Sequence, residues 1–206
     1  LFLAADSSLT THLPASGLRT YLYDANDPTP GAEHLSPDPL PDWSPRNLAF
    51  LEQRTDVLSY TAAPVREPVE VAGPVHVALH AASSAPDTDF AAILADVAPD
   101  GTSVFISHGI MRASYRTSLA IRTPLKPHQP EQFTIELADV AHVLLPGHAL
   151  RLVICSCLFP YYHPNPNTGA GYGEETDGDY AAARQTVLSG GERASHLSVY
   201  VRAPEA

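Results

Sequence analysis

Proline and glycine are spread along the whole chain and divide it into short apolar runs. The sequence has 20 prolines and 12 glycines among 206 residues, and they do not gather in one linker. Because proline breaks the interior of a helix and both residues favour turns, this pattern is typical of short strands rather than long helices. We therefore expect an all-β fold, a sandwich or a barrel, with residues 1–206 as a single domain.

Alternation of apolar and polar side chains locates the strands. Residues 132–137 and 196–202 alternate, as strands with one buried face do, whereas 149–157 is almost continuously apolar and is expected to be a central strand. Together with the turn residues between them, these runs predict about ten strands. The expected strands are residues 19–23, 55–60, 69–83, 89–98, 103–107, 110–116, 132–137, 149–157 and 196–202, and 180–187 fits either a helix or a strand.

Two stretches lack this pattern and are expected to be long loops. Residues 24–54 are rich in proline and have few apolar side chains before Leu48. Residues 160–179 are rich in proline, asparagine, glycine and acidic residues. Loops of this length in a compact domain are usually functional or disordered, so both stretches are candidate functional regions.

The balance of charges argues against several kinds of partner. Lys and Arg number 12 against 23 Asp and Glu, and the net charge of −11 has the wrong sign for binding nucleic-acid phosphates or an anionic membrane surface. No apolar run reaches about 18 residues and no signal peptide is present, so we expect a cytoplasmic location. The chain begins inside an apolar run and its only methionine is Met111, so we expect a domain of a longer protein.

A search for catalytic motifs finds none. The G-x-S-x-G turn of α/β-hydrolases is absent. Ser107 and His108 are neighbours on an expected strand, so their side chains point to opposite faces and cannot form a dyad by themselves. Cys155 and Cys157 lie in an apolar run and are expected to be small buried core residues.

The histidines and acidic residues give little basis for a metal site, and no metal or cofactor is expected. His76 and His80 share a strand face, but the standard rise per residue places them about 13 Å apart, too far to bind one ion. Asp87 and Asp89 fit a turn that begins a strand, and a contribution to a calcium site is the alternative.

Several short motifs stand in a recognisable order along most of the chain. The most specific is SSAPDTDF at 83–90, which is followed at a matching distance by DVAPDG at 96–101. The others are YLYD at 21–24, DPTP at 27–30, RTDVLSY at 54–60, PVEVAGP at 68–74, GIMRASYR at 109–116, PGH at 146–148, FP at 159–160, NPNTG at 165–169 and SHL at 195–197. In this order the motifs resemble the C-terminal domain of the X-prolyl dipeptidyl aminopeptidase and cocaine esterase family of serine hydrolases.

This resemblance implies a jelly-roll β-sandwich similar to galactose-binding domains. It also implies that a Ser-His-Asp triad in a preceding α/β-hydrolase domain cleaves esters or amides, so this chain has no catalytic residue and is expected to be inactive alone. Its expected partners are the α/β-hydrolase domain and, through that domain, an ester or peptide substrate. The family-motif residues expected to be structural are Asp56, Asp87, Asp89, Phe90, Asn165 and Asn167.

A proline-rich loop is the candidate for reaching the substrate. His34, Leu35 and Trp43 lie on it, and apolar groups on a stiff loop suit the wall of a cleft because little entropy is lost on ordering. The alternative is that Leu35 and Trp43 cover an edge of the sandwich itself.

A second group of residues is the candidate for contact between domains. Arg112, Tyr115 and Arg116 lie together in the GIMRASYR motif and would form the interdomain surface, against the alternative of a solvated strand face. Two other functions remain open, a free-standing carbohydrate-binding module and an oligomerisation domain, because a fold alone does not decide function.

Overall fold

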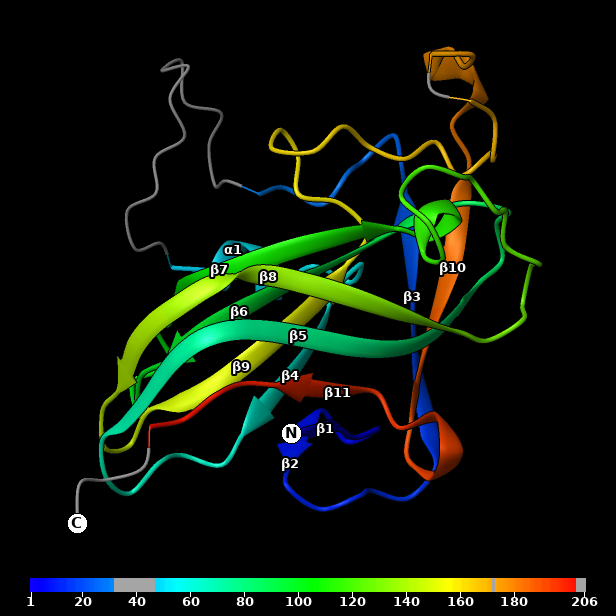
Figure 1. Ribbon diagram of the computed structural model, residues 1–206. Helices are drawn as coiled ribbons and strands as arrows, with labels where there is room; N and C mark the ends of the chain where they lie inside the picture. The colour runs from blue at the N-terminus through cyan, green and yellow to red at the C-terminus, as the bar shows by residue number, and fades with distance from the viewer. Residues whose placement is uncertain (32–46, 172, 203–206) are drawn as a thin grey trace.

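The computed structural model describes residues 1–31, 47–171 and 173–202, and it confirms the all-β sandwich (Figure 1). The strands are β1 (Phe2–Leu3), β2 (Ser8–Thr10), β3 (Gly17–Asp24), β4 (Leu58–Ala62), β5 (Val69–Ser83), β6 (Asp89–Val97), β7 (Ser103–Arg112), β8 (Glu131–Leu144), β9 (Ala149–Cys155), β10 (Ala182–Ser189) and β11 (His196–Ser198). The helices are α1 (Ala49–Glu52) and the 3₁₀ turns η1 (Ala113–Tyr115), η2 (Asp177–Asp179) and η3 (Gly191–Arg193). None of the helices in these described ranges is long and apolar enough to cross a membrane.

The strands form one hydrogen-bonded sheet that folds into two layers. The order is β3-β10-β5-β11-β1-β2-β4-β9-β6-β7, and β8 pairs with β5. One layer contains β3, β10, β5 and β8, and the layer behind it contains β4, β9, β6 and β7 (Figure 1). The core lies between these layers, and the Phe90 and Phe133 rings meet there with centroids 4.8 Å apart.

Strand β6 is buried along its whole length because both of its faces are covered. Phe90 and Leu94 belong to the main core between the layers. Ala91 and Ile93 face the other way, into a smaller apolar cluster that includes Leu51 of α1. A strand covered on both sides needs apolar residues at nearly every position, which explains its continuous apolar sequence.

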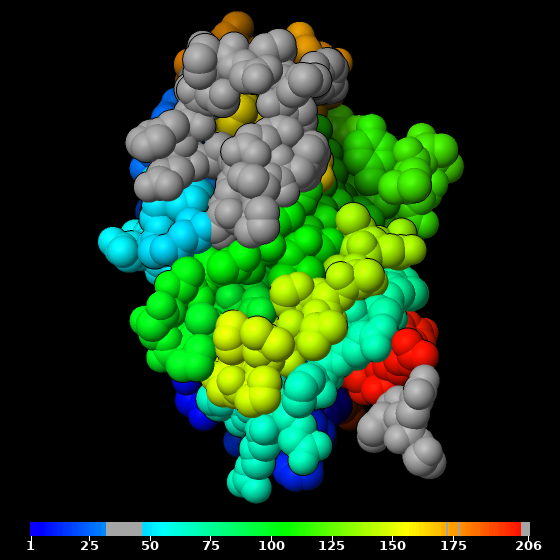
Figure 2. Space-filling view, turned by 90° about the vertical axis from the view of Figure 1, so that its left-hand side faces the viewer, coloured from blue at the N-terminus to red at the C-terminus, as the bar shows by residue number. Residues whose placement is uncertain are grey.

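The two layers touch closely where β7 runs past β8, and Figure 2 shows these strands side by side in green and yellow-green. A Cβ atom at Gly109 would lie 2.0 Å from the backbone oxygen of Glu136, so only glycine fits. The Ser107 hydroxyl donates a hydrogen bond of 2.7 Å to the Ala138 carbonyl oxygen. We call this contact, Gly109 and Ser107 against Glu136 and Ala138, the β7–β8 seam.

The structure differs from the expected strand boundaries in several places. Residues 103–107 and 110–116 were expected as two strands, but β7 is one continuous strand because Gly109 lets it pass β8 without a break. The strand ends at Arg112, and the next three residues form η1. Residues 132–137 are only the first half of β8. The ambiguous stretch 180–187 is a strand, β10, since it pairs with β3 on one side and β5 on the other. The short helix α1 lies inside the expected loop 24–54.

Candidate functional site

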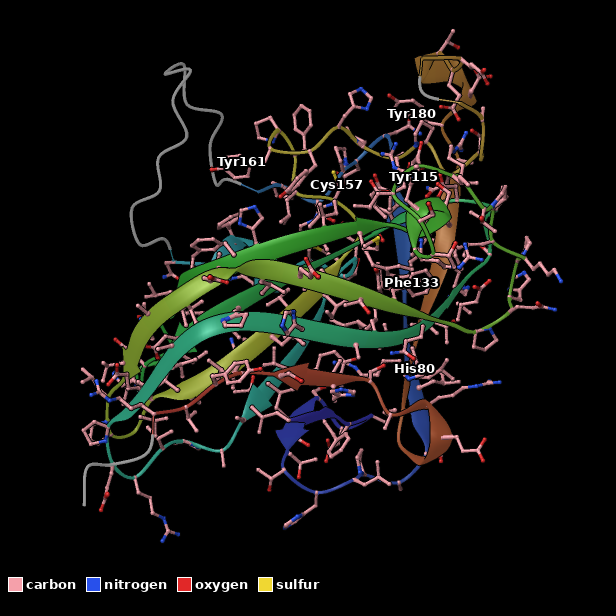
Figure 3. All side chains as sticks on the ribbon, viewed as in Figure 1. His80, Tyr115, Phe133, Cys157, Tyr161 and Tyr180 are labelled. Atoms are coloured by element: carbon pink, nitrogen blue, oxygen red, sulfur yellow. The ribbon has the colours of Figure 1, made fainter. Side chains whose placement is uncertain are left out.

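Most of the family-motif residues converge at one end of the sandwich. The turn 84–88, the segment 113–130 and the loop 156–181 meet there, at the top of Figure 1, and we call these three segments the loop end. Figure 3 labels Tyr115, Tyr161 and Tyr180 in this region, whereas His80 lies lower, on β5.

A partly buried ion pair, with a buried carboxylate, fixes the loop end to the sheet. Asp89, at the start of β6, is 3% exposed and stands opposite Arg112 at the end of β7. Arg112 donates hydrogen bonds from Nε and Nη2 to the two Asp89 oxygens, at 2.9 and 3.1 Å. The Asn165 amide donates a third, of 2.9 Å. Burial raises the pKa of Asp89, and the charge and hydrogen bonds of Arg112 partly offset this rise.

The neighbouring Asp87 organises the turn before β6. Its Oδ1 accepts hydrogen bonds of 2.9 Å from the backbone N–H groups of Thr88 and Ser114, and its Oδ2 accepts one of 2.9 Å from the Ser114 hydroxyl. Arg122 lies 3.5 Å from Oδ2 and also donates to the Gly169 carbonyl oxygen at 3.0 Å. Both carboxylates are therefore engaged by N–H and O–H donors, Asp87 in the turn before β6 and Asp89 within β6. Among the described residues no group of His, Cys, Asp or Glu is placed to hold a metal ion.

The segment after η1 projects from the sandwich but is braced by arginine. The Arg116 side chain is 7% exposed and forms a two-pronged ion pair with Glu131. It also donates to the carbonyl oxygens of Ala113, at 3.1 Å, and Thr123, at 2.5 Å. Arg116 thus acts as a structural brace of this loop, a use that the sequence did not indicate, and its place in an interdomain surface stays a prediction.

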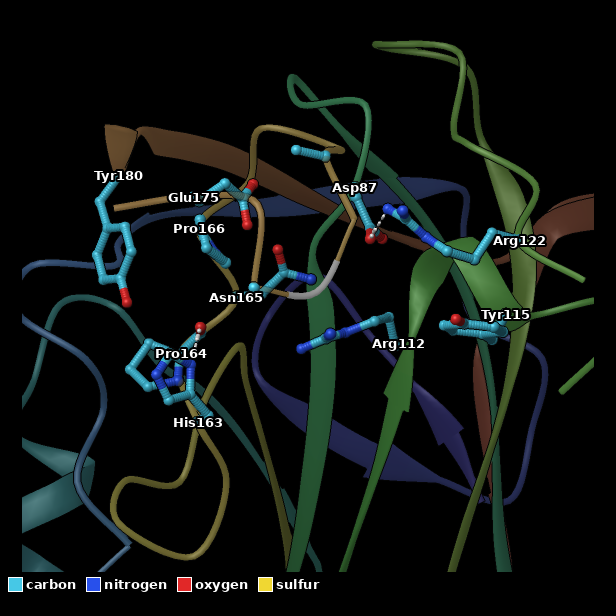
Figure 4. Close-up of a pocket in the computed structure, with 12 residues that line it drawn as sticks. Asp87, Arg112, Tyr115, Arg122, His163, Pro164, Asn165, Pro166, Glu175 and Tyr180 are labelled. Carbon is cyan, nitrogen blue, oxygen red and sulfur yellow. Dashed lines mark hydrogen bonds and ion pairs between the residues drawn. The ribbon is translucent and has the colours of Figure 1, made fainter. Parts of the chain in front are cut away.

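A pocket of about 240 Å³ opens beside the ion pair (Figure 4). It is lined by groups from all three segments of the loop end, so its shape depends on their docking. Its walls include Asp87, Arg112, Tyr115, Asn165, Glu175 and Tyr180.

Asp56 lies in a separate cluster that fixes the region before β4. Arg54 donates from Nε and Nη2 to its two oxygens, at 2.7 and 3.0 Å, and the buried Thr29 hydroxyl donates at 2.7 Å. Arg54 also pairs with Asp27 at 3.1 Å, so it joins the DPTP and RTDVLSY motifs. The sequence pointed to Asp56 but not to Thr29 as its partner.

The remaining predicted residues have simpler places. Phe90 is fully buried in the core. Asn167 adopts φ 65°, which asparagine tolerates, and its amide donates a 2.6 Å hydrogen bond to the Ala181 carbonyl oxygen. The cleft candidates His34, Leu35 and Trp43 lie outside the described residues.

One further cluster was missed from the sequence. Asp96, 7% exposed, accepts hydrogen bonds of 2.8 Å from His142 and from His148. His148 belongs to the PGH motif, and this motif was the only signal in the sequence that pointed to the cluster. The cluster ties β6 and β8 to the turn before β9, away from the loop end.

Comparisons with known proteins identify the family. The model of the X-Pro dipeptidyl-peptidase C-terminal non-catalytic domain matches residues 1–198. The chain belongs to this family. The resemblance drawn from the motifs is thereby confirmed, and the loop-end clusters are the structural frame of a non-catalytic domain.

Several relatives of this family domain are much longer than the chain. A cocaine esterase from Rhodococcus sp. (strain MB1 Bresler) is 35% identical over 178 residues, which are 86% of this chain and 31% of the esterase. The crystal structure of an aminopeptidase from a marine sediment archaeon, Thaumarchaeota archaeon, superposes with a TM-score of 0.93 at 28% identity, over 98% of this chain and 36% of that one. An α-amino acid ester hydrolase gives a TM-score of 0.88 at 31% identity, with the same coverage of 98% and 36%. The chain thus spans about a third of the length of these relatives.

Proposed function

We propose that this domain is an accessory domain that packs against the α/β-hydrolase domain of a serine hydrolase, with the loop end as its contact surface. The length of the relatives supports this, because 31% of the cocaine esterase and 36% of each solved hydrolase correspond to the present chain. In this role the domain supplies no reacting group and stabilises the hydrolase domain by covering part of it. The proline-rich loop with Leu35 and Trp43 would add a wall to the substrate cleft of the complete enzyme.

The observation that carries the proposal is the pair of side chains at the tip of the braced loop. Leu119 and Ile121 are 84% and 68% exposed, the highest values for large apolar residues in the described part of the chain. The loop that holds them is fixed by Arg116 and Arg122. Rigid presentation lowers the entropy lost on docking, and burying two such side chains contributes about 3–6 kcal/mol.

The test replaces Leu119 and Ile121 together by Asp in the complete product of the gene that encodes this chain. We expect the half-life of p-nitrophenyl acetate hydrolysis at elevated temperature to fall at least about tenfold, since two charges would enter a buried contact. The unfolding midpoint of the 206-residue chain alone should not change, because both side chains are exposed there.

A matched control introduces the same charges at two exposed leucines on a different face of the domain. Leu18 and Leu22 on the outer face of β3 are 56% and 52% exposed, and replacing both by Asp should leave the complete enzyme's half-life unchanged. Equal loss in the two double variants, or no loss in either, would contradict docking through the loop end. A coding sequence without an α/β-hydrolase domain would contradict the accessory role altogether.

A further inference from the structure

The pocket at the loop end has one carboxylate that is not paired with either of its arginines. Arg112 is paired with Asp89, and Arg122 lies 3.5 Å from Asp87. The carboxylate of Glu175 also lines the pocket, and it has no hydrogen-bond or ion-pair partner among the described residues. Asp87, Asp89 and Glu175 thus stand against two guanidinium groups, and Glu175 is the carboxylate left to attract a cation. The His163 imidazole also lines the pocket, and its Nδ1 is hydrogen-bonded to the Pro164 carbonyl oxygen at 3.0 Å.

The same pocket offers hydrogen-bond donors that the ion pair leaves unused. Arg112 gives Nε and Nη2 to Asp89, so its Nη1 hydrogens have no partner in the described part of the chain. Asn165 gives one of its two amide hydrogens to Asp89 and keeps the other. Figure 4 shows the Arg112 guanidinium on one side of Asn165 and the Glu175 carboxylate on the other. The pocket therefore presents a carboxylate that can pair with a cation and, across from it, N–H groups that can donate hydrogen bonds to an oxygen atom.

The size and walls of the pocket limit what fits. Its volume of about 240 Å³ is below the range of about 300–1,000 Å³ typical of sites for drug-sized ligands, so it suits a group of amino-acid size. Tyr115, Tyr180, His163 and two prolines, Pro164 and Pro166, also line it, and Ala170 and Gly173 make up the rest. Aromatic rings are favourable neighbours for an organic cation.

We propose that this pocket binds an ammonium group with an adjacent carbonyl or carboxylate oxygen, the chemistry shared by a free α-amino acid and by the amino terminus of a peptide. The ammonium pairs with Glu175, and the oxygen accepts hydrogen bonds from Arg112 Nη1 and the Asn165 amide. A neutral sugar leaves the Glu175 carboxylate without a cation, and an anion placed beside Glu175 is repelled by it. The docking proposal rests on Leu119 and Ile121, which do not line the pocket.

The test is a titration of the 206-residue chain followed by two-dimensional ¹⁵N–¹H NMR. L-alaninamide, which carries the ammonium and the oxygen, should bind with a dissociation constant of about 1–10 mM and shift the backbone amides of pocket residues such as Tyr115 and Ala170. N-acetyl-L-alaninamide, which lacks the ammonium, should produce no saturable shift there. L-alanine distinguishes the two sources: tighter binding than the amide indicates a free amino acid, and weaker binding indicates a peptide terminus.

Two neighbouring glutamates provide the matched variants. Glu175→Gln removes the carboxylate charge without removing a contact of the fold, and it should weaken L-alaninamide binding at least about tenfold. Glu174→Gln, adjacent in sequence but bonded to the Gly171 N–H, should bind within twofold of the native chain. The proposal is overturned if L-alaninamide causes no saturable shift, if the acetylated compound binds equally well, if Glu175→Gln binds as the native chain does, or if D-galactose saturates these amides in its place.

Discussion

The β7–β8 seam and the loop end both join segments that are distant in sequence, but they do so by opposite means. At the seam, Gly109 lets two backbones approach so closely that no side chain fits between them. At the loop end, Asp89, Arg112 and Asn165 join β6, β7 and a loop 76 residues further on through charge-assisted hydrogen bonds. A packed contact tolerates almost no change of shape, whereas an ion-paired contact can be weakened in steps. The loop end is thus suited to docking and binding, and the seam to stability.

The largest effect is expected at the seam, from Gly109→Val. The new side chain would begin 2.0 Å from the Glu136 backbone oxygen, and because backbone cannot move aside easily, the free energy of unfolding should fall by about 3 kcal/mol or more. Urea denaturation followed by circular dichroism measures this. Gly178→Ala is the control, since its nearest neighbour would be the Thr176 hydroxyl at 3.8 Å, and it should cost less than about 0.5 kcal/mol. Similar losses in the two variants would remove the distinction between the regions.

An intermediate effect is expected at the loop end, from Arg112→Met. The variant leaves the Asp89 carboxylate buried without its cation, which should cost about 2–3 kcal/mol, less than a fully buried pair because the Arg112 side chain is 32% exposed. Burial raises the pKa of Asp89, so the folded state holds the proton more tightly than the unfolded chain does. Stability lost at neutral pH should therefore be regained in part as the pH falls toward the ordinary value of 3.8.

The control for this variant is Arg66→Met, at an exposed arginine outside both regions, and it should change the unfolding free energy by less than about 0.5 kcal/mol. A loss in Arg112→Met that is the same at neutral and acidic pH would assign it to lost packing rather than to the unpaired carboxylate.

The smallest effect is expected in the reactivity of two thiols, which compares the loop end with the sheet next to it. Cys155, at the end of β9, and Cys157, at the start of the loop, are 0% and 1% exposed, and burial raises the pKa of Cys157 to about 12. Neither thiol should react with a disulfide reagent at pH 8 in the native state, because almost none is present as thiolate. In mild urea the Cys155→Ala variant, which keeps only Cys157, should label faster than Cys157→Ala, since the loop end opens locally before the sheet does. Equal labelling rates would show that the loop end and strand β9 open together.

The sequence predicted those parts of the fold that local patterns determine. Alternation located the strand 132–137, although β8 continues to Leu144, and the apolar run 149–157 did become a central strand, β9, between β4 and β6. The stretch 180–187 could not be decided locally, because helix propensity and alternation compete there and only pairing with β3 and β5 settles it.

The candidate site was predictable only in part. Asp87, Asp89 and Asn165 were singled out by the motifs that carry them, but which groups they bond to depends on contacts across the fold. Arg122 lies outside every motif and 35 residues from Asp87, so no local pattern could reveal it. Arg116 was expected at a surface, and its ion pair with Glu131 shows that a charged residue in a motif can be a brace instead.

The most direct test of the central claim, that this is a non-catalytic domain, is turnover by the 206-residue chain itself. The chain would be incubated with p-nitrophenyl acetate and an X-Pro-nitroanilide, and separately labelled with a fluorophosphonate probe for reactive serines. We predict hydrolysis at the buffer rate and no labelled residue. Turnover above that rate with one serine labelled would contradict the account, and the labelled residue would show where a catalytic site lies.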